Sequence, residues 1–121
     1  MTDKIAWGLI STGAISQTFA RALTTSKTGR LVAVASRSQE AADKFGKEFN
    51  APRCYGSYEA LLADREVQAV YVSPPHPFHA EWCIRAAEAG KHILCEKPMT
   101  MNAAEAMCVL EAVQVNNVFF M

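Results

Sequence analysis

The sequence lacks a net charge, a long hydrophobic run and a paired-cysteine motif. Among its 121 residues, 12 Lys and Arg balance 12 Asp and Glu, whereas proteins that bind nucleic acid or membrane surfaces non-specifically are usually basic. No apolar run approaches the ~20 residues that a membrane helix requires, and the N-terminus has no signal-peptide features. We therefore expect a cytoplasmic protein with neither nucleic acid nor membrane as a partner.

The sequence also lacks a zinc-binding pattern. Its four cysteines form no C-x-x-C pair and have no histidine at ligand spacing. Cys83, Cys95 and Cys108 each lie in an apolar stretch, which predicts buried free thiols. His76 and His79 are close in sequence, but two ligands in one loop do not make a zinc site. We expect no metal.

The sequence does contain short apolar runs, typical of buried strands, that alternate with segments of helical hydrophobic spacing. Apolar runs predict strands at 5–10, 31–35, 53–55, 67–73, 92–95 and 118–121, and helical spacing predicts helices at 16–23, 39–49, after Ser57, at 78–89 and from 102 to about 115. Ser38 and Ser57 are typical N-caps, and Gly90 is typical of a helix end. Buried strands between amphipathic helices predict an α/β fold, a Rossmann-type doubly wound parallel sheet.

The chain stops inside its last predicted strand, 118–121, without a polar tail. A domain end is usually solvated, so we expect residues 1–121 to be a nucleotide-binding Rossmann domain truncated at its C-terminal end. On this expectation, segment 118–121 pairs in the sheet and leaves apolar surface for the rest of a longer protein.

A candidate phosphate-binding loop follows the first predicted strand, at the strand end where open α/β sheets bind ligands. The dinucleotide fingerprint G-x-G-x-x-G/A requires small residues at three places, which are here Ser11, Gly13 and Ser16. The middle glycine lets the backbone approach a pyrophosphate. Ser11 departs from glycine and tolerates a positive φ poorly, so an ordinary strand–turn–helix is the alternative. The residues expected to bind the cofactor here are Ser11, Thr12, Gly13, Ala14 and Ile15.

The end of the second predicted strand carries no acidic residue. Ser36 follows Gly13 by 23 positions, near the ~20 at which an NAD-binding fold places its ribose-binding carboxylate. Ser36, Arg37 and Ser38 stand there instead. A carboxylate repels a 2′-phosphate, whereas an arginine attracts one and can stack on adenine. The sequence therefore favours NADP over NAD as the cofactor, with a solvated Arg37 as the alternative.

A candidate catalytic lysine follows the fifth predicted strand, which ends in Cys95-Glu96-Lys97-Pro98. A lysine beside a nicotinamide orients a substrate hydroxyl and relays its proton, and burial moves its pKa toward the working range. We expect Lys97 to have this role; a solvated turn lysine is the alternative.

These segments resemble the glucose–fructose oxidoreductase and inositol dehydrogenase (Gfo/Idh/MocA) family over essentially the whole chain. The likeness is carried by Trp7–Ser16, Tyr55–Glu59, Pro74–His79 and Ala89–Pro98, the last of which contains the Glu-Lys-Pro element. Ser11 and the segment 94–98 most resemble the branch of dihydrodiol dehydrogenases and NADP-dependent D-xylose dehydrogenases.

The resemblance implies an NAD(P)-dependent oxidoreductase that transfers a hydride between the nicotinamide and a sugar or cyclic alcohol. It implies that the nicotinamide side is lined by Ser73, Pro74, His76, His79, Glu96 and Lys97. In the family a C-terminal α+β domain supplies most substrate contacts and often an oligomer interface. We therefore expect a homo-oligomer through that domain and an inactive isolated chain.

Two other functions are alternatives to an oxidoreductase. A non-catalytic nucleotide-binding module is the alternative if the natural chain is this short. A methyltransferase would need an acid at the end of the second strand and leaves the Glu-Lys-Pro element unexplained.

Overall fold

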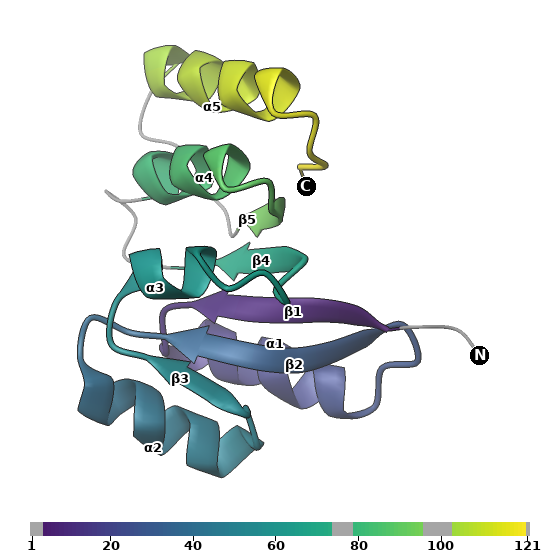
Figure 1. Cartoon of the computed structure of the whole chain (residues 1–121), viewed down its shortest axis with the longest axis vertical. Helices are drawn as coiled ribbons and strands as arrows, with labels where there is room; N and C mark the ends of the chain where they lie inside the picture. Colours follow the sequence, from purple (N-terminus) through teal and green to yellow (C-terminus); the bar gives the residue numbers. More distant parts are fainter. Residues whose placement is uncertain (1–3, 74–78, 96–102, 121) are drawn as a thin grey trace.

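The computed structural model describes residues 4–73, 79–95 and 103–120. Five parallel strands form one sheet in the order β3-β2-β1-β4-β5, and helices connect them (Figure 1). The strands are β1 (Ile5–Ile10), β2 (Gly29–Ala35), β3 (Arg53–Tyr55), β4 (Ala69–Val72) and β5 (His92–Cys95). The helices are α1 (Ala14–Thr24), α2 (Gln39–Phe49), α3 (Tyr58–Leu62), α4 (His79–Glu88) and α5 (Ala103–Val115). The predicted Rossmann-type α/β fold is confirmed.

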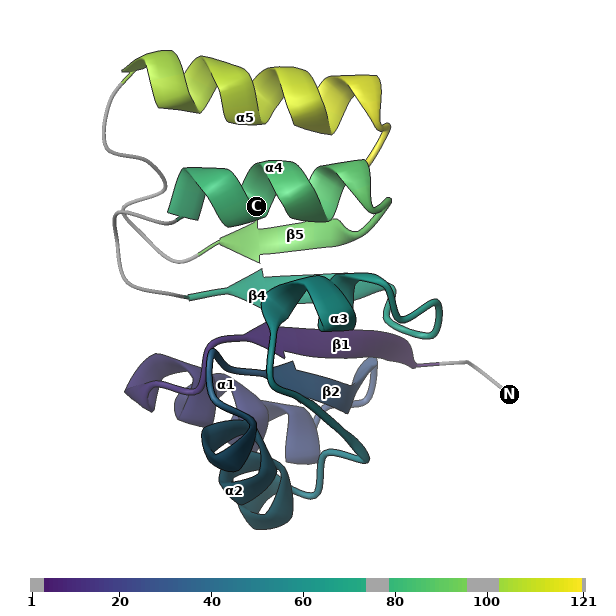
Figure 2. The ribbon, with the colours of Figure 1, turned by 60° about the vertical axis from the view of Figure 1, so that its left-hand side comes forward.

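Helices cover both faces of the sheet (Figure 1, Figure 2). α1 and α2 pack on one face around Leu9, Val34 and Tyr71, while α3 and α4 pack on the other around Ile10 and Val72. Successive residues of a strand point to opposite faces, so strands buried on both faces are apolar throughout. This arrangement explains the continuous apolar runs in the sequence and confirms the doubly wound prediction.

Three helix boundaries follow the local signals in the sequence. The Ser38 hydroxyl accepts a hydrogen bond from the backbone N–H of Ala41 at 3.4 Å, and the Ser57 hydroxyl accepts one from Ala60 at 3.1 Å. Gly90 follows α4 with φ of +78°, a left-handed conformation that glycine adopts without cost. The caps predicted at these three positions are confirmed.

The C-terminal part of the described chain differs from expectation in two ways. The predicted strand at 118–121 is reduced to one parallel bridge between Phe120 and Ile93, supported by a 2.8 Å hydrogen bond from the Ile93 N–H to the Phe119 carbonyl. The prediction that Cys108 is buried is wrong, because Cys108 lies on the exposed side of α5. The few polar residues of α5 are spread around the helix and do not gather on one face, so its sequence does not indicate that the side with Val109 is the buried one. In the described ranges, no helix is long and apolar enough to cross a membrane.

A polar cluster fixes the turn between α3 and β4. The Asp64 carboxylate accepts hydrogen bonds from Arg53 at 2.7 Å, from the Tyr55 hydroxyl at 2.8 Å and from the backbone N–H of Glu66 at 2.9 Å. The buried Lys91 ammonium donates to the carbonyls of Asp64 and Val67, each at 2.7 Å. Desolvation alone raises the pKa of Asp64, but the hydrogen bonds from Arg53 and Tyr55 outweigh it and hold the pKa below its ordinary value.

Replacing Asp64 by asparagine is expected to lower the free energy of unfolding by about 2 kcal/mol, because charge-assisted bonds are lost at a largely buried carboxylate. A carboxylate with a lowered folded pKa stabilises the fold above the ordinary aspartate pKa of about 3.9, and this stability is lost as the pH falls through the folded value. Urea unfolding at pH 7 and pH 3 should therefore show a smaller pH dependence in Asp64→Asn. Glu66→Gln, at an exposed carboxylate, is the control; an equal change in both variants contradicts the assignment.

Candidate cofactor-binding site

One row of paired residues crosses the sheet at the carboxyl ends of the strands. Ile10 of β1 lies opposite Ala35 of β2 and Val72 of β4, and the row continues to Tyr55 and Cys95 at the outer strands. The chain therefore leaves all five strands at the same level. The segments that follow these strands meet along one edge of the sheet, where sequence analysis placed the cofactor.

Backbone hydrogen bonds extend this row by one residue. The Ser11 N–H donates to the Ala35 carbonyl at 2.9 Å, and the Ser73 N–H donates to the Ile10 carbonyl at 3.2 Å. The Ser36 N–H donates in the same way to the outer strand β3, at 3.1 Å. The three predicted residues Ser11, Ser36 and Ser73 are thus brought together at the edge.

The chain reverses its direction of winding between β1 and β4. β1 continues through α1 to β2, on one side, and β4 lies on its other side and continues through α4 on the opposite face. Connections that diverge in this way leave a crevice between two strand ends, which is where ligands bind in open α/β sheets. Ser11 and Ser73 stand at the two sides of this point.

The N-terminus of α1 has no side-chain cap, unlike those of α2 and α3. Its N-cap is Gly13, and its first turn holds no acidic residue. Gly13 has φ of −73°, which any residue adopts, so its backbone conformation does not require glycine. A Cβ atom built at Gly13 would meet no atom within 4 Å. Free N–H groups beside open space at a helix N-terminus fit a phosphate group.

The unusual backbone conformation lies at Ser11, where φ is +101°. This is the first glycine position of the fingerprint, which forms the tight turn after β1. The expectation that serine is poorly suited there is correct in physical terms, since a Cβ is crowded at positive φ. The turn is nevertheless formed with serine, so neighbouring groups must hold it.

A buried pair of hydroxyls joins α1 to β4. The Ser16 and Ser73 hydroxyl oxygens lie 2.6 Å apart, and the Ser73 hydroxyl is also 3.4 Å from the Ile10 carbonyl. Ser16 is 0% exposed and fills the third small-residue position of the fingerprint. A larger side chain there would push α1 away from the strand ends, so this pair sets the distance between the helix N-terminus and the edge of the sheet.

The segment after β2 presents a cation without a counter-charge. Arg37 is exposed, and in the described part of the chain no carboxylate lies within ion-pair distance of it. Ser38 is already occupied as the cap of α2, and the Ser36 hydroxyl lies 3.5 Å from the Ser38 N–H. Arg37 is therefore the residue of this segment with its side chain available to an anion.

Several predicted site residues lie outside the described residues. These are Pro74, His76, Glu96 and Lys97; His79 begins α4, but its side chain is likewise not described. The strands that precede them, β4 and β5, end at the edge with the cofactor loop.

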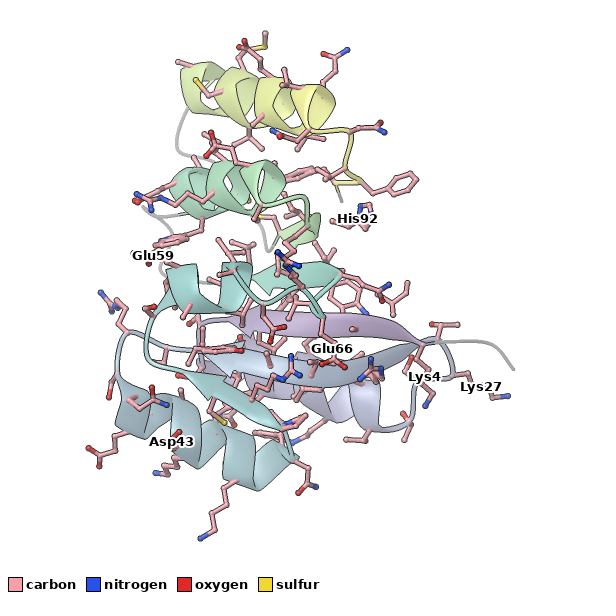
Figure 3. All side chains as sticks on the ribbon, viewed as in Figure 1. Lys4, Lys27, Asp43, Glu59, Glu66 and His92 are labelled. Atoms are coloured by element: carbon pink, nitrogen blue, oxygen red, sulfur yellow. The ribbon has the colours of Figure 1, made fainter. Side chains whose placement is uncertain are left out.

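Sequence analysis missed Tyr58, the first residue of α3. It is 5% exposed, and its ring packs edge-on against Trp82 with centroids 4.8 Å apart. Burial raises the pKa of Tyr58, while the charge of Arg37 acts in the opposite direction. Figure 3 places the neighbouring Glu59 on the side of the sheet away from Lys4 and His92, which mark the amino ends of β1 and β5. A tyrosine on a short amphipathic helix looks like a core residue, so sequence alone carried no signal.

A cavity also lies at the opposite edge of the sheet. It measures about 710 Å³ and is lined by residues at the amino ends of the strands, including Ile5, Ala69 and His92. It shares no residue with the loops around Ser11, Ser36 and Ser73, so we place no part of the cofactor in it.

The chain matches a known family and several individual proteins. The family described as an oxidoreductase family with an NAD-binding Rossmann fold matches residues 5–121. Trans-1,2-dihydrobenzene-1,2-diol dehydrogenase of Xenopus laevis is 41% identical over 117 residues, which are 95% of this chain and 36% of that protein. The mouse (Mus musculus) enzyme of the same name is 39% identical over 97% of this chain. The chain thus spans 36% of the length of these relatives.

Solved structures share the arrangement of the sheet and helices. A 3-ketoreductase from Actinomadura kijaniata in complex with NADP superimposes with a TM-score of 0.93 at 33% identity, covering 98% of this chain and 38% of that one. A putative NADPH-dependent oxidoreductase from Desulfitobacterium hafniense gives a TM-score of 0.92 at 31% identity, covering 100% of this chain and 35% of that one.

Proposed function

Because the chain belongs to the Gfo/Idh/MocA oxidoreductase family, we propose that it binds NADP and forms the cofactor-binding part of an NADP-dependent dehydrogenase or reductase. The observation that carries this proposal is the open, uncapped N-terminus of α1 at Gly13, at the same edge of the sheet as Arg37, an exposed cation with no ion-pair partner in the described part of the chain. One anionic group fits the N-terminus of α1, and a second anionic group fits the Arg37 side chain. NADP carries both, a pyrophosphate and a 2′-phosphate.

In this proposal the residues 11–15 hold the pyrophosphate. The backbone N–H groups of residues 12–15 face it at the start of α1, since the Ser11 N–H already donates to Ala35, and the exposed Ile15 offers an apolar surface beside it. Ser36 and Arg37 receive the 2′-phosphate, since an arginine forms paired hydrogen bonds with phosphate oxygens. Ser73 with Pro74, His76, His79, Glu96 and Lys97 forms the nicotinamide side, by their resemblance to the family pattern.

The proposed reaction is the transfer of a hydride between the nicotinamide and a carbinol carbon, the chemistry that this cofactor supplies when bound. Lys97 accepts or returns the proton of the substrate hydroxyl. The relatives act on a cyclic diol or carry a ketoreductase name, so we propose a small cyclic alcohol, sugar or polyol as the substrate. For the whole protein we propose a cytoplasmic homo-oligomer.

Replacing Arg37 by alanine is expected to weaken NADPH binding roughly tenfold or more, because a hydrogen bond to a charged group contributes about 1.5–3 kcal/mol. NADH lacks the 2′-phosphate, so its affinity should change little. Fluorescence titration of the chain with each cofactor measures the two affinities.

Arg30→Ala is the matched control, since Arg30 lies at the other end of β2 and the substitution removes the same charge. It should leave both affinities unchanged. An equal loss for NADPH and NADH in Arg37→Ala removes Arg37 from the 2′-phosphate site.

A further inference from the structure

A serine holds the first turn of α1 against the domain. The buried residues of α1 are Ser16, Ala20 and Leu23, which are three or four positions apart and therefore share one face of the helix. Further along the helix, Phe19 stacks on Tyr71 of β4 with ring centroids 4.3 Å apart. The middle and end of α1 are thus held by apolar contacts, whereas the buried side chain of its first turn is polar.

The hydroxyl of Ser16 is more than the position requires for packing. The dinucleotide fingerprint is satisfied there by glycine or alanine, neither of which has a hydrogen-bonding side chain. Ser16 is 0% exposed, and a buried hydroxyl is costly unless it has a hydrogen-bond partner. Serine at this position therefore needs a partner that alanine would not.

Ser73, which follows β4, is this partner. The two hydroxyl oxygens lie 2.6 Å apart, and the Ser73 hydroxyl donates a longer bond of 3.4 Å to the Ile10 carbonyl of β1. This leaves the Ser16 hydroxyl to donate to Ser73, so both protons are used. The two serines are 57 positions apart in the sequence. Their bond joins α1 to the ends of β4 and β1, at the point where the winding of the sheet reverses.

We propose that Ser16 and Ser73 are positioning residues that hold the pyrophosphate half and the nicotinamide half of the cofactor site in a fixed relation. The inference rests on the proposed NADP-binding function, in which the N-terminus of α1 carries the pyrophosphate and the segment that begins at Ser73 forms the nicotinamide side. Without the bond, the first turn of α1 is free to shift relative to the end of β4. A ligand that contacts both sides then loses more affinity than a ligand that contacts one.

Two ligands of different reach test this coupling: NADPH, and 2′-phospho-ADP-ribose, which lacks the nicotinamide. In Ser16→Ala and in Ser73→Ala, titration calorimetry should show NADPH affinity about fivefold lower, the effect of one neutral hydrogen bond. The affinity for 2′-phospho-ADP-ribose should stay within about twofold of the parent. The double variant should be no weaker than either single variant, because both substitutions remove the same bond. Ser73→Thr keeps the hydroxyl and should keep NADPH affinity within about twofold of the parent.

Thr24→Ala is the matched control, since it removes a 2.6 Å hydroxyl bond at the other end of the same helix. Both affinities should be unchanged in this variant. An equal loss for the two ligands in the single variants means that the pair supports only the loop or the fold, and this result overturns the proposal. A further loss when Ser73→Ala is added to Ser16→Ala also overturns it, because Ser73 then acts on the cofactor independently of Ser16.

Amide hydrogen exchange of the chain without cofactor gives a second readout. The Gln17 N–H donates to the Gly13 carbonyl at 3.1 Å, at the start of α1. Its exchange should be faster in both alanine variants of the pair and unchanged in Ser73→Thr and Thr24→Ala. If these exchange results hold and the parent chain does not bind NADPH, the proposed function fails while the attachment of α1 to the end of β4 stands. Unchanged exchange together with unchanged affinities overturns the proposal.

Discussion

Replacing Gly13 by valine is expected to reduce NADPH affinity at least about a hundredfold, equivalent to ~2.7 kcal/mol, and to leave the domain folded. We expect binding to be affected without folding, because Gly13 has an ordinary φ and a Cβ atom at this position would lie in open space. The free protein therefore accommodates the side chain. The valine methyl groups would occupy the space through which the pyrophosphate reaches the N–H groups of α1.

Fluorescence titration with NADPH and thermal unfolding followed by circular dichroism measure the two effects on the same samples. Ala22→Val is the matched control, since it adds the same methyl groups at an exposed position of the same helix and should leave the affinity unchanged. A Gly13→Val protein that binds NADPH with the parent affinity shows that Gly13 is only a turn residue. One that unfolds shows that the space is needed by the fold.

Replacing Lys97 by methionine is expected to lower kcat at least about a hundredfold, since a positioned acid–base group contributes ~10²–10⁴-fold to the rate. NADPH affinity should change little, because the proposed phosphate contacts are made by the loop 11–15 and by Arg37. Lys97 follows Cys95 by two residues, and Cys95 belongs to the row of residues at the cofactor edge. Methionine is unbranched and one atom shorter, so it keeps most of the side chain and removes its charge and proton.

Steady-state kinetics on the protein at the full length of its relatives, beside a cofactor titration, measures both quantities. Lys47→Met removes a charge from the exposed side of α2 and should leave both unchanged. An unaltered kcat in Lys97→Met makes Lys97 a solvated turn residue. A loss of NADPH binding makes it a cofactor anchor instead of a proton relay.

Local signals in the sequence predicted the features that local chemistry determines. Ser38 and Ser57 cap helices through their own hydroxyls, and Gly90 ends α4 at positive φ. The fingerprint also located the loop between β1 and α1. It also pointed to position 11 as the place of a positive φ, which Ser11 has. It did not show that Gly13 has an ordinary φ, because the pattern records small residues and not the reason for each.

The features that the sequence did not predict depend on contacts between distant segments. Tyr58 packs against Trp82 only because α3 and α4 cover the same face of the sheet. Cys108 is exposed because, in the described part of the chain, α5 packs against the core through the side with Val109, whereas the apolar residues of its sequence are spread around the helix. Neither fact follows from the hydrophobic periodicity of the sequence, since both depend on how the helices pack against one another and against the sheet.

The common row at the strand ends has a consequence for protein engineering. Because Ile10, Ala35 and Val72 are in register, each segment that follows them starts from a position fixed by the sheet and not by the neighbouring segments. A segment that follows one strand can therefore be exchanged between family members without changes to the strands of the sheet. Exchanging residues 36 and 37 for acidic ones, with Ser38 kept as the cap of α2, should shift the cofactor preference from NADP toward NAD and leave the proposed catalytic segment 96–98 unchanged.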